Sequence, residues 1–322
     1  MPSINRIRRL TIVAALTSFM LPAFAQQYPS RPIRLIVPYA AGGSTDQLAR
    51  VIQQPLADAL GQPVIVENKP GAGGTIGVDA VVRAEPDGHT LVFGNTGPNG
   101  IVSLMRKVPY DLQKDLRPIS NVVIAPMILA VRSDLPAKTV KEFVEYAKQQ
   151  GDKLNYGSVG TGSLSHLTGE YFNNLAGTRL LHSPYNGGAP MMTAFLSGDI
   201  HAAFVTGLDG ATLLQTGKVR YLAVATPQPS EAVPGLPTIA AAVPGFKSSA
   251  WFGVLAPKGL PDTIANKLTA TINEIVKRPE IRQKFIDRKV EPNAGSAEDL
   301  ARLIRDEMQQ WEPVVKKANI VM

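Results

Sequence analysis

Three short segments of the sequence combine glycine with hydroxyl side chains, each directly after an apolar run. They are residues 38–46 (PYAAGGSTD), 68–75 (NKPGAGGT) and 156–163 (YGSVGTGS). Glycine lets backbone N–H groups come close to a ligand, and a helix that begins after such a loop adds unpaired N–H groups and the positive end of its dipole. Together with Ser and Thr hydroxyls, these groups are chemically suited to bind an anion.

One such loop would be better explained as an ordinary turn, with glycine at a tight corner and Ser or Thr capping a helix. Three loops at equivalent positions favour a shared function, because ligands of open α/β sheets bind at the carboxyl ends of the strands, where these loops lie. Asp46, in the first loop, could accept a hydrogen bond from a ligand or could balance the N-terminus of its own helix.

The sequence lacks the signatures of common enzyme classes. Residues 71–77 read GAGGTIG, in which Ile76 replaces the last glycine of a dinucleotide fingerprint. There is no GxxxxGK[ST] phosphate loop, and neither Ser158 nor Ser163 lies in a GxSxG nucleophile motif. The chain has no Cys, and its histidines lack metal-ligand spacing, although His166 could line a cleft. We therefore expect a protein that is not an enzyme and that uses no cofactor or metal.

Apolar runs expected to form buried strands alternate with amphipathic helices along the chain. The expected strands are 33–37, 64–66, 90–93, 127–131, 154–158, 180–182, 200–205, 221–225 and 251–255. The expected helices are 44–60, 75–84, one opened by a Thr139–Glu142 capping box, 163–175, 189–197, 264–276 and one capped by Ser296 with Asp299. This order predicts an α/β protein with mainly parallel sheets flanked by helices.

The length of 322 residues, of which 44% are hydrophobic and 18% charged, suits two domains of ordinary size and excludes a disordered chain. Two α/β series, followed by a long helical return, predict two lobes with a cleft between them. We place residues 26–125 with 249–322 in lobe 1 and residues 126–248 in lobe 2, with boundaries uncertain by about ten residues.

Residues 1–25 have the pattern of a cleaved export signal. Arg6, Arg8 and Arg9 precede the apolar run 10–21, and Ala23-Phe24-Ala25 is a small-x-small cleavage site. An N-terminal membrane anchor is the alternative, but the run is short for a bilayer. Cleavage after Ala25 removes three Arg and no acid, which lowers the formal net charge from +7 to +4. The scattered basic residues argue against nucleic acid as a partner.

The glycine loops and two further segments carry a family resemblance. The segments are 38–46, 66–74, 156–167, 184–190 (PYNGGAP) and 251–257 (WFGVLAP). Together they resemble the tripartite tricarboxylate transporter substrate-binding family, also called the Bug or TctC group, over nearly the whole mature chain. The resemblance implies a periplasmic solute-binding protein with a two-lobed Venus flytrap fold, type II-like, whose lobes close over a small carboxylate and pass it to membrane permease subunits.

The resemblance also implies which residues hold the ligand. The first loop and the loop of lobe 2 would grip carboxylate groups through backbone N–H groups, hydroxyls and bridging waters. The expected ligand-binding residues are Tyr39, Gly42, Gly43, Ser44, Asp46, Ala72, Gly73, Ser158, Thr161, Gly162, Ser163, His166, Tyr185, Thr206 and Asp209.

The sequence departs from the family pattern at several positions of the distal pocket, including Asn186, Ala194 and His201. We therefore do not name the ligand, which could be a di- or tricarboxylate, an aromatic carboxylate or a similar molecule. Two alternatives stay open: an exported ligand sensor that presents its bound form to a two-component sensor kinase, and an exported hydrolase.

Overall fold

The computed structural model describes residues 28–320, apart from the side chains of residues 209 and 211–213. The expected signal segment, residues 1–25, lies outside the described residues, and so does the side chain of Asp209.

The strands form one mixed sheet in the order β2-β1-β3-β9-β4-β7-β5-β6, and β8 and β10 also pair with β4. Parallel pairing joins β1 to β2 and β3, and β5 to β6 and β7, as the alternating pattern predicts. The strands are β1 (Ile33–Val37), β2 (Val64–Asn68), β3 (Thr90–Asn95), β4 (Leu116–Arg132), β5 (Asn155–Ser158), β6 (Leu181–Pro184), β7 (Ala202–Thr206), β8 (Val219–Val224), β9 (Ser249–Pro257) and β10 (Glu291–Pro292).

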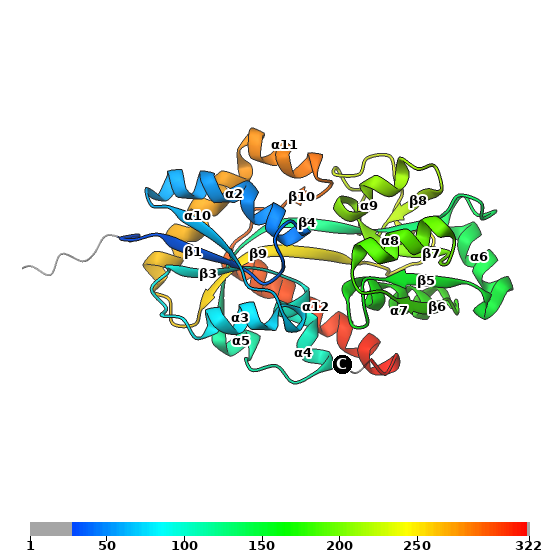
Figure 1. Ribbon diagram of the computed structural model, residues 1–322, viewed down its shortest axis with the longest axis horizontal. Coiled ribbons are helices and arrows are strands. Elements are labelled where there is room, and N and C mark those ends of the chain that lie inside the picture. The colour runs from blue at the N-terminus through cyan, green and yellow to red at the C-terminus, as the bar shows by residue number, and fades with distance from the viewer. Residues whose placement is uncertain (1–27, 321–322) are drawn as a thin grey trace, which may run out of the picture.

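Two long strands, β4 and β9, run antiparallel through the middle of the molecule and link its two halves (Figure 1). One part of β4 pairs with β9, and the other pairs with β7 and β8. The expectation of mainly parallel sheets therefore needs a correction, since β4 and β9 pair with their neighbours in the antiparallel sense. The sequence pattern showed only 127–131 of β4, because buried polar residues such as Ser120 and Asn121 interrupt its apolar run.

Helices cover both faces of the sheet in each half (Figure 1). They are α2 (Ser44–Leu60), α3 (Thr75–Val82), α4 (Val102–Met105), α5 (Leu112–Asp115), α6 (Val140–Gln150), α7 (Leu164–Ala176), α8 (Gly188–Ser197), α9 (Gly207–Leu214), α10 (Asp262–Lys277), α11 (Pro279–Asp287) and α12 (Ala297–Lys317). None of the helices in residues 28–320 is both long and apolar enough to cross a membrane.

Local signals in the sequence account for several helix ends. Gly61 adopts φ 71° and closes α2 as its C-cap. Ser296 and Asp299 form a reciprocal capping box at the start of α12. At α6 the box is only half formed, because the carboxylate of Glu142 accepts the N–H of Lys138 instead of that of Thr139.

Separate apolar cores lie in the two halves of the molecule. One is built around α2, α10 and the strands β1 and β3, and includes Leu48, Leu268 and Phe285. Another joins α6 and α7 to β4 and β7, and includes Phe143 and Phe172. A smaller cluster connects α4, α7 and α12 through Met105, Leu167 and Trp311. The two halves are therefore joined by the β4–β9 pair and by this smaller cluster.

Candidate functional site

A cavity of about 320 Å³ lies where the loops after β1, β3 and β5 meet. Its lining comes from both halves of the molecule: the residues are Tyr39, Gly73, Asn95, Thr96, Gly97, Ile101, Val102, Met105, Val159, Gly160, Thr161, Gly162, Ser163, Leu164 and Ala250. None of these described lining residues carries a formal charge. Of the expected binding residues, Tyr39, Gly73, Thr161, Gly162 and Ser163 line this cavity, which we call the loop cavity.

The N-terminal end of α7 faces the loop cavity. Ser163 is its N-cap and accepts the N–H of His166 at 3.3 Å. Within residues 28–320, the amide N–H groups of Thr161 and Leu164 donate to no protein atom. Since both residues line the cavity, an anion there would meet free backbone donors and the positive end of a 13-residue helix.

Not every N–H of this loop is free. Gly162 donates its N–H to Nδ1 of His166 at 3.0 Å, and Gly160 donates its N–H to Oγ of Ser158 at 3.2 Å. Ser158 is fully buried and its hydroxyl also contacts Nε2 of His182 at 2.7 Å. Ser158 and His166 therefore shape the loop from beneath and do not line the cavity.

Asp46 has the same supporting position under the first loop. Its carboxylate accepts the N–H of Gly42 at 2.9 Å, the amide of Asn68 at 3.0 Å and the guanidinium of Arg50 at 2.9 Å. Burial would raise the pKa of Asp46, but the hydrogen bonds from Arg50, Gly42 and Asn68 outweigh it and lower the pKa. With 2% of its surface exposed, Asp46 holds the first loop in place through these hydrogen bonds.

Asn95, at the end of β3, connects the cavity wall to the first turn of α2. The amide of Asn95 donates to Oγ1 of Thr45 at 3.1 Å, and its Oδ1 lies 3.3 Å from the hydroxyl of Tyr39. Burial raises the pKa of Tyr39 to about 12, so its ring contributes a neutral hydroxyl. Gly42, Gly43 and Ser44 lie at the start of α2, beside this wall but outside the cavity lining.

The second glycine loop, residues 71–74, is held by a guanidinium. Arg106 donates to the carbonyl oxygen of Ala72, whose φ is 46°, and a Cβ on Gly73 would lie 3.5 Å from the same guanidinium. Gly73 lines the cavity and Ala72 does not.

The sequence analysis missed one wall of the cavity, the segment from Asn95 to Met105. It includes a π-helical turn (Gly97–Ile101) and α4, and it supplies the apolar side chains of Ile101, Val102 and Met105. The signal was present, because residues 94–100 (GNTGPNG) again place glycine and hydroxyl or amide side chains directly after a strand.

Two further expected residues lie apart from the lining. Tyr185 donates its backbone N–H to the carbonyl of Ser158 at 3.0 Å, and Thr206 ends β7, where it pairs with Met127 of β4. Asp209 lies on α9, but its side chain is outside the described part of the structure. These positions remain predictions for the ligand-bound protein.

A stacked pair of histidines supports the α7 loop. The rings of His166 and His182 lie 3.7 Å apart between centroids and only 7° from parallel. Burial, followed by the charge of His182, lowers the pKa of His166 to about 4, and burial lowers the pKa of His182 to about 4. Both rings are therefore neutral at pH 7, which lets Nδ1 of His166 accept the N–H of Gly162.

Acid is expected to destabilise the protein through this pair. An unfolded histidine takes up a proton near pH 6.5, whereas these two resist protonation down to about pH 4, so stability is present above pH 6.5 and is lost toward pH 4. The melting temperature of a His182→Gln variant should fall less between pH 6.5 and pH 4.5 than that of the wild type. Equal slopes in the two melting series would contradict a neutral pair.

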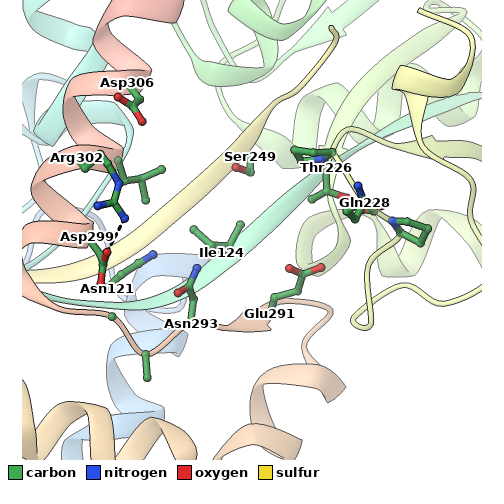
Figure 2. Close-up of a pocket in the computed structure, with 15 residues that line it drawn as sticks. Asn121, Ile124, Thr226, Gln228, Ser249, Glu291, Asn293, Asp299, Arg302 and Asp306 are labelled. Atoms are coloured by element: carbon green, nitrogen blue, oxygen red, sulfur yellow. Dashed lines mark hydrogen bonds and ion pairs between the residues drawn. The ribbon is translucent and has the colours of Figure 1, made fainter. Parts of the chain in front are cut away.

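A second cavity, of about 570 Å³, lies between α12, β10 and the segment after β8 (Figure 2). Neighbouring residues of β9 separate it from the loop cavity: Ala250 lines the loop cavity and Ser249 lines the second. Because successive residues of a strand point to opposite faces, the two cavities lie on opposite sides of β9. None of the expected binding residues with a described side chain lines the second cavity, so the loop cavity is the candidate site.

The described residues contain no group of three or more His, Asp or Glu side chains that could hold a metal ion. The described lining of the loop cavity offers hydroxyl, amide and backbone donors together with apolar side chains. Its arrangement can bind an anion without a side-chain charge, through N–H groups and helix dipoles.

Comparison with known proteins identifies the family. Residues 48–320 match the family described as the tripartite tricarboxylate transporter family receptor. A UPF0065 protein of Bordetella bronchiseptica is 38% identical over 316 residues, which are 97% of this chain and 93% of that protein. Protein BugT of Bordetella pertussis is 33% identical over 321 residues, 98% of each chain.

Solved structures of similar proteins show the same likeness. An R. palustris protein with adipate has a TM-score of 0.81 and 34% identity, covering 91% of this chain and 99% of that one. MatC from Rhodopseudomonas palustris with bound malate has a TM-score of 0.76 and 33% identity, covering 89% and 100%. The periplasmic binding protein BugD has a TM-score of 0.76 and 33% identity, covering 91% and 99%. These likenesses confirm the two-lobed α/β fold of periplasmic binding proteins, and the chain belongs to the solute-binding receptors of the tripartite tricarboxylate transporter family.

Proposed function

We propose that this protein captures a small carboxylate in the loop cavity, closes its two lobes over it and delivers it to the membrane subunits of a tripartite transporter. The observation that carries the proposal is the N-terminal end of α7, where Thr161 and Leu164 line the cavity and their N–H groups have no partner among the described residues. A carboxylate is the simplest anion that accepts such donors.

The apolar wall of the cavity indicates what lies next to the carboxylate. Ile101, Val102, Met105 and Leu164 offer hydrocarbon surface, and no charged side chain lies among the described residues of this lining. Such a wall suits a carboxylate with an aliphatic or aromatic body better than a compact, multiply charged molecule. The adipate and malate of two neighbouring structures belong to the same chemical class, although adipate has the longer hydrocarbon chain.

The energetics are sufficient for useful affinity. A micromolar dissociation constant corresponds to about −8 kcal/mol. A few charge-assisted hydrogen bonds, each of about 1.5–3 kcal/mol, together with apolar burial can supply this after ordering costs. Closure requires that the ligand bind the closed form more tightly than the open one, and a lining drawn from both halves of the molecule allows this.

The lobes in this proposal are residues 26–125 with 249–322 and residues 126–248, which meet at the β4–β9 crossing. Export to the periplasm, with cleavage after Ala25, is supported by the signal pattern of residues 1–25 and by relatives described as periplasmic binding proteins. The family is one of solute-binding receptors, and the proposal assigns the protein no catalytic step.

A thermal-shift screen of the mature protein tests the proposal. The screen compares aliphatic and aromatic mono- and dicarboxylates with their uncharged amides. We expect selective stabilisation by the acids, because a ligand that binds only the native state stabilises it by mass action, by about 2.7 kcal/mol at a concentration 100 times the dissociation constant. Equal stabilisation by an acid and its amide would reject carboxylate recognition.

A further inference from the structure

The second cavity contains a buried side chain that points into it without a partner. Asn121 on β4 has only 3% of its surface exposed. Its Oδ1 accepts the N–H of Val122 at 3.0 Å, which turns the amide nitrogen toward the cavity, as Figure 2 shows. Within residues 28–320 this nitrogen donates to no atom. The side chain is buried but its nitrogen opens into the cavity, where the oxygen atom of a ligand can accept its N–H.

The same cavity carries an excess of negative charge. Glu291 on β10 and Asp306 on α12 line it, and neither carboxylate has an ion-pair or hydrogen-bond partner in the described part of the chain. Asp299 also lines it but is paired with Arg302 at 2.5 Å, and Arg302 is the one cation among the described residues of the lining. Three carboxylates against one guanidinium leave this lining with a formal charge of −2.

The two unpaired carboxylates approach the cavity from different sides. Figure 2 shows Asp306 on the helix at one side and Glu291 on the strand at another, with Asn121 and Asn293 lying along the floor between them. Because the two carboxylates come from different elements, each can attract its own cationic group of a ligand that carries two.

We propose that this cavity is a second ligand site, which binds a small organic dication that also carries a hydrogen-bond-accepting oxygen. Amides and esters of basic amino acids have this composition. In such a ligand the two cationic groups face Glu291 and Asp306, and the carbonyl oxygen accepts the amide N–H of Asn121. The site does not overlap the loop cavity, because it lies on the other face of β9.

Isothermal titration with L-argininamide at pH 6.5 and low salt tests the site, with agmatine as the dication that lacks the carboxamide. We expect saturable binding of argininamide, and binding of agmatine that is about two- to tenfold weaker, which is the usual value of one neutral hydrogen bond. Glu291→Gln and Asp306→Asn should each weaken argininamide binding about two- to fivefold, as the loss of one partly exposed ion pair does.

Two further variants complete the design. Asn121→Asp keeps the oxygen that accepts the N–H of Val122 and removes the donor, so it should abolish the preference for argininamide over agmatine. Glu145→Gln makes the same charge change on an exposed residue of α6, far from the cavity, and should leave the affinity unchanged. The proposal fails if wild-type protein does not saturate, if agmatine binds as tightly as argininamide, or if Glu145→Gln acts like Glu291→Gln.

Discussion

A Thr161→Asp variant is expected to bind carboxylates at least about tenfold more weakly than the wild type. Thr161 lines the loop cavity directly before the first turn of α7, and its side chain is exposed. A carboxylate at this position competes with the ligand for the same helix dipole and repels its charge by about 1–4 kcal/mol at 4 Å, depending on the local dielectric. The fold should survive, because an acidic residue near a helix N-terminus is favourable.

The matched control is Thr161→Asn, which has the same shape as the aspartate and no charge. Titration of the best-stabilising carboxylate into wild type and both variants gives the comparison, with melting temperatures as a check on folding. The asparagine variant should stay within a few-fold of the wild type. If the aspartate and asparagine variants bind equally well, the carboxylate group does not lie at the N-terminal end of α7, and the site assignment is wrong.

Replacement of Glu307 by glutamine is expected to stabilise the protein at pH 8 and to remove a large pH dependence. Glu307 on α12 is 8% exposed and accepts the indole N–H of Trp251 at 2.7 Å, while its other oxygen lies 3.4 Å from the hydroxyl of Thr96. Burial raises its pKa to about 8, although hydrogen bonds from Trp251 and Thr96 and the charge of Lys247 oppose the shift.

The direction of this pH dependence follows from the linkage between proton binding and folding. Between the ordinary pKa of 4.5 and about pH 8, the folded protein holds a proton on Glu307 that the unfolded chain has lost. Stability from this group is therefore fully present below pH 4.5 and falls by up to about 1.4 kcal/mol per pH unit as the pH rises to 8. Glutamine keeps the acceptor for Trp251 and has no charge to bury, so its stability should not fall over this range.

Urea unfolding of wild type and Glu307→Gln at several pH values between 5 and 9 measures the difference. Subtracting the two curves cancels the opposite, acid-side effect of His166 and His182, since both proteins contain that pair. Asp306→Asn removes a neighbouring but exposed charge and should give a nearly flat difference. A glutamine variant that is less stable than the wild type at pH 8 would show that Glu307 is ionised and well compensated in the fold.

The position of Glu307 adds a structural consequence for the loop cavity. Thr96 lines the cavity, accepts the backbone N–H of Trp251 at 3.1 Å and donates its hydroxyl to Oε1 of Glu307 at 3.4 Å. These hydrogen bonds join the end of β3, the strand β9 and α12. The cavity wall at Thr96 is therefore hydrogen-bonded to the C-terminal helix, although Thr96 and Glu307 are far apart in the sequence.

Much of this fold could be predicted from short-range patterns. Most of the strands and the longer helices, the C-cap at Gly61 and the capping box at Ser296 follow from interactions within a few residues, whereas α4, α5, α9, α11 and β10 were not predicted. The position of three glycine loops at the ends of strands also followed, because parallel strands in an α/β unit direct their carboxyl ends to one edge. Five of the expected binding residues line the cavity for that reason.

Other features depended on packing that no local pattern encodes. The apolar wall from Ile101 to Met105 and the partnership of Glu307 with Trp251 join segments that meet only when the strands and α12 are assembled. Competition for backbone donors could not be predicted from local patterns either. Gly42 and Gly162 were expected to offer their N–H groups to a ligand, but the side chains of Asp46 and His166 accept them.

Periodicity and capping in the linear chain were enough to establish an α/β protein with anion-suited loops, because those signals come from residues within about one helical turn or one strand. The assembled molecule alone established which donors remain free, which side chains enclose them and that a second, negatively charged cavity lies behind β9. Each of these depends on burial and on contacts between residues far apart in sequence, and a hydrogen bond forms only where the whole chain brings donor and acceptor within reach.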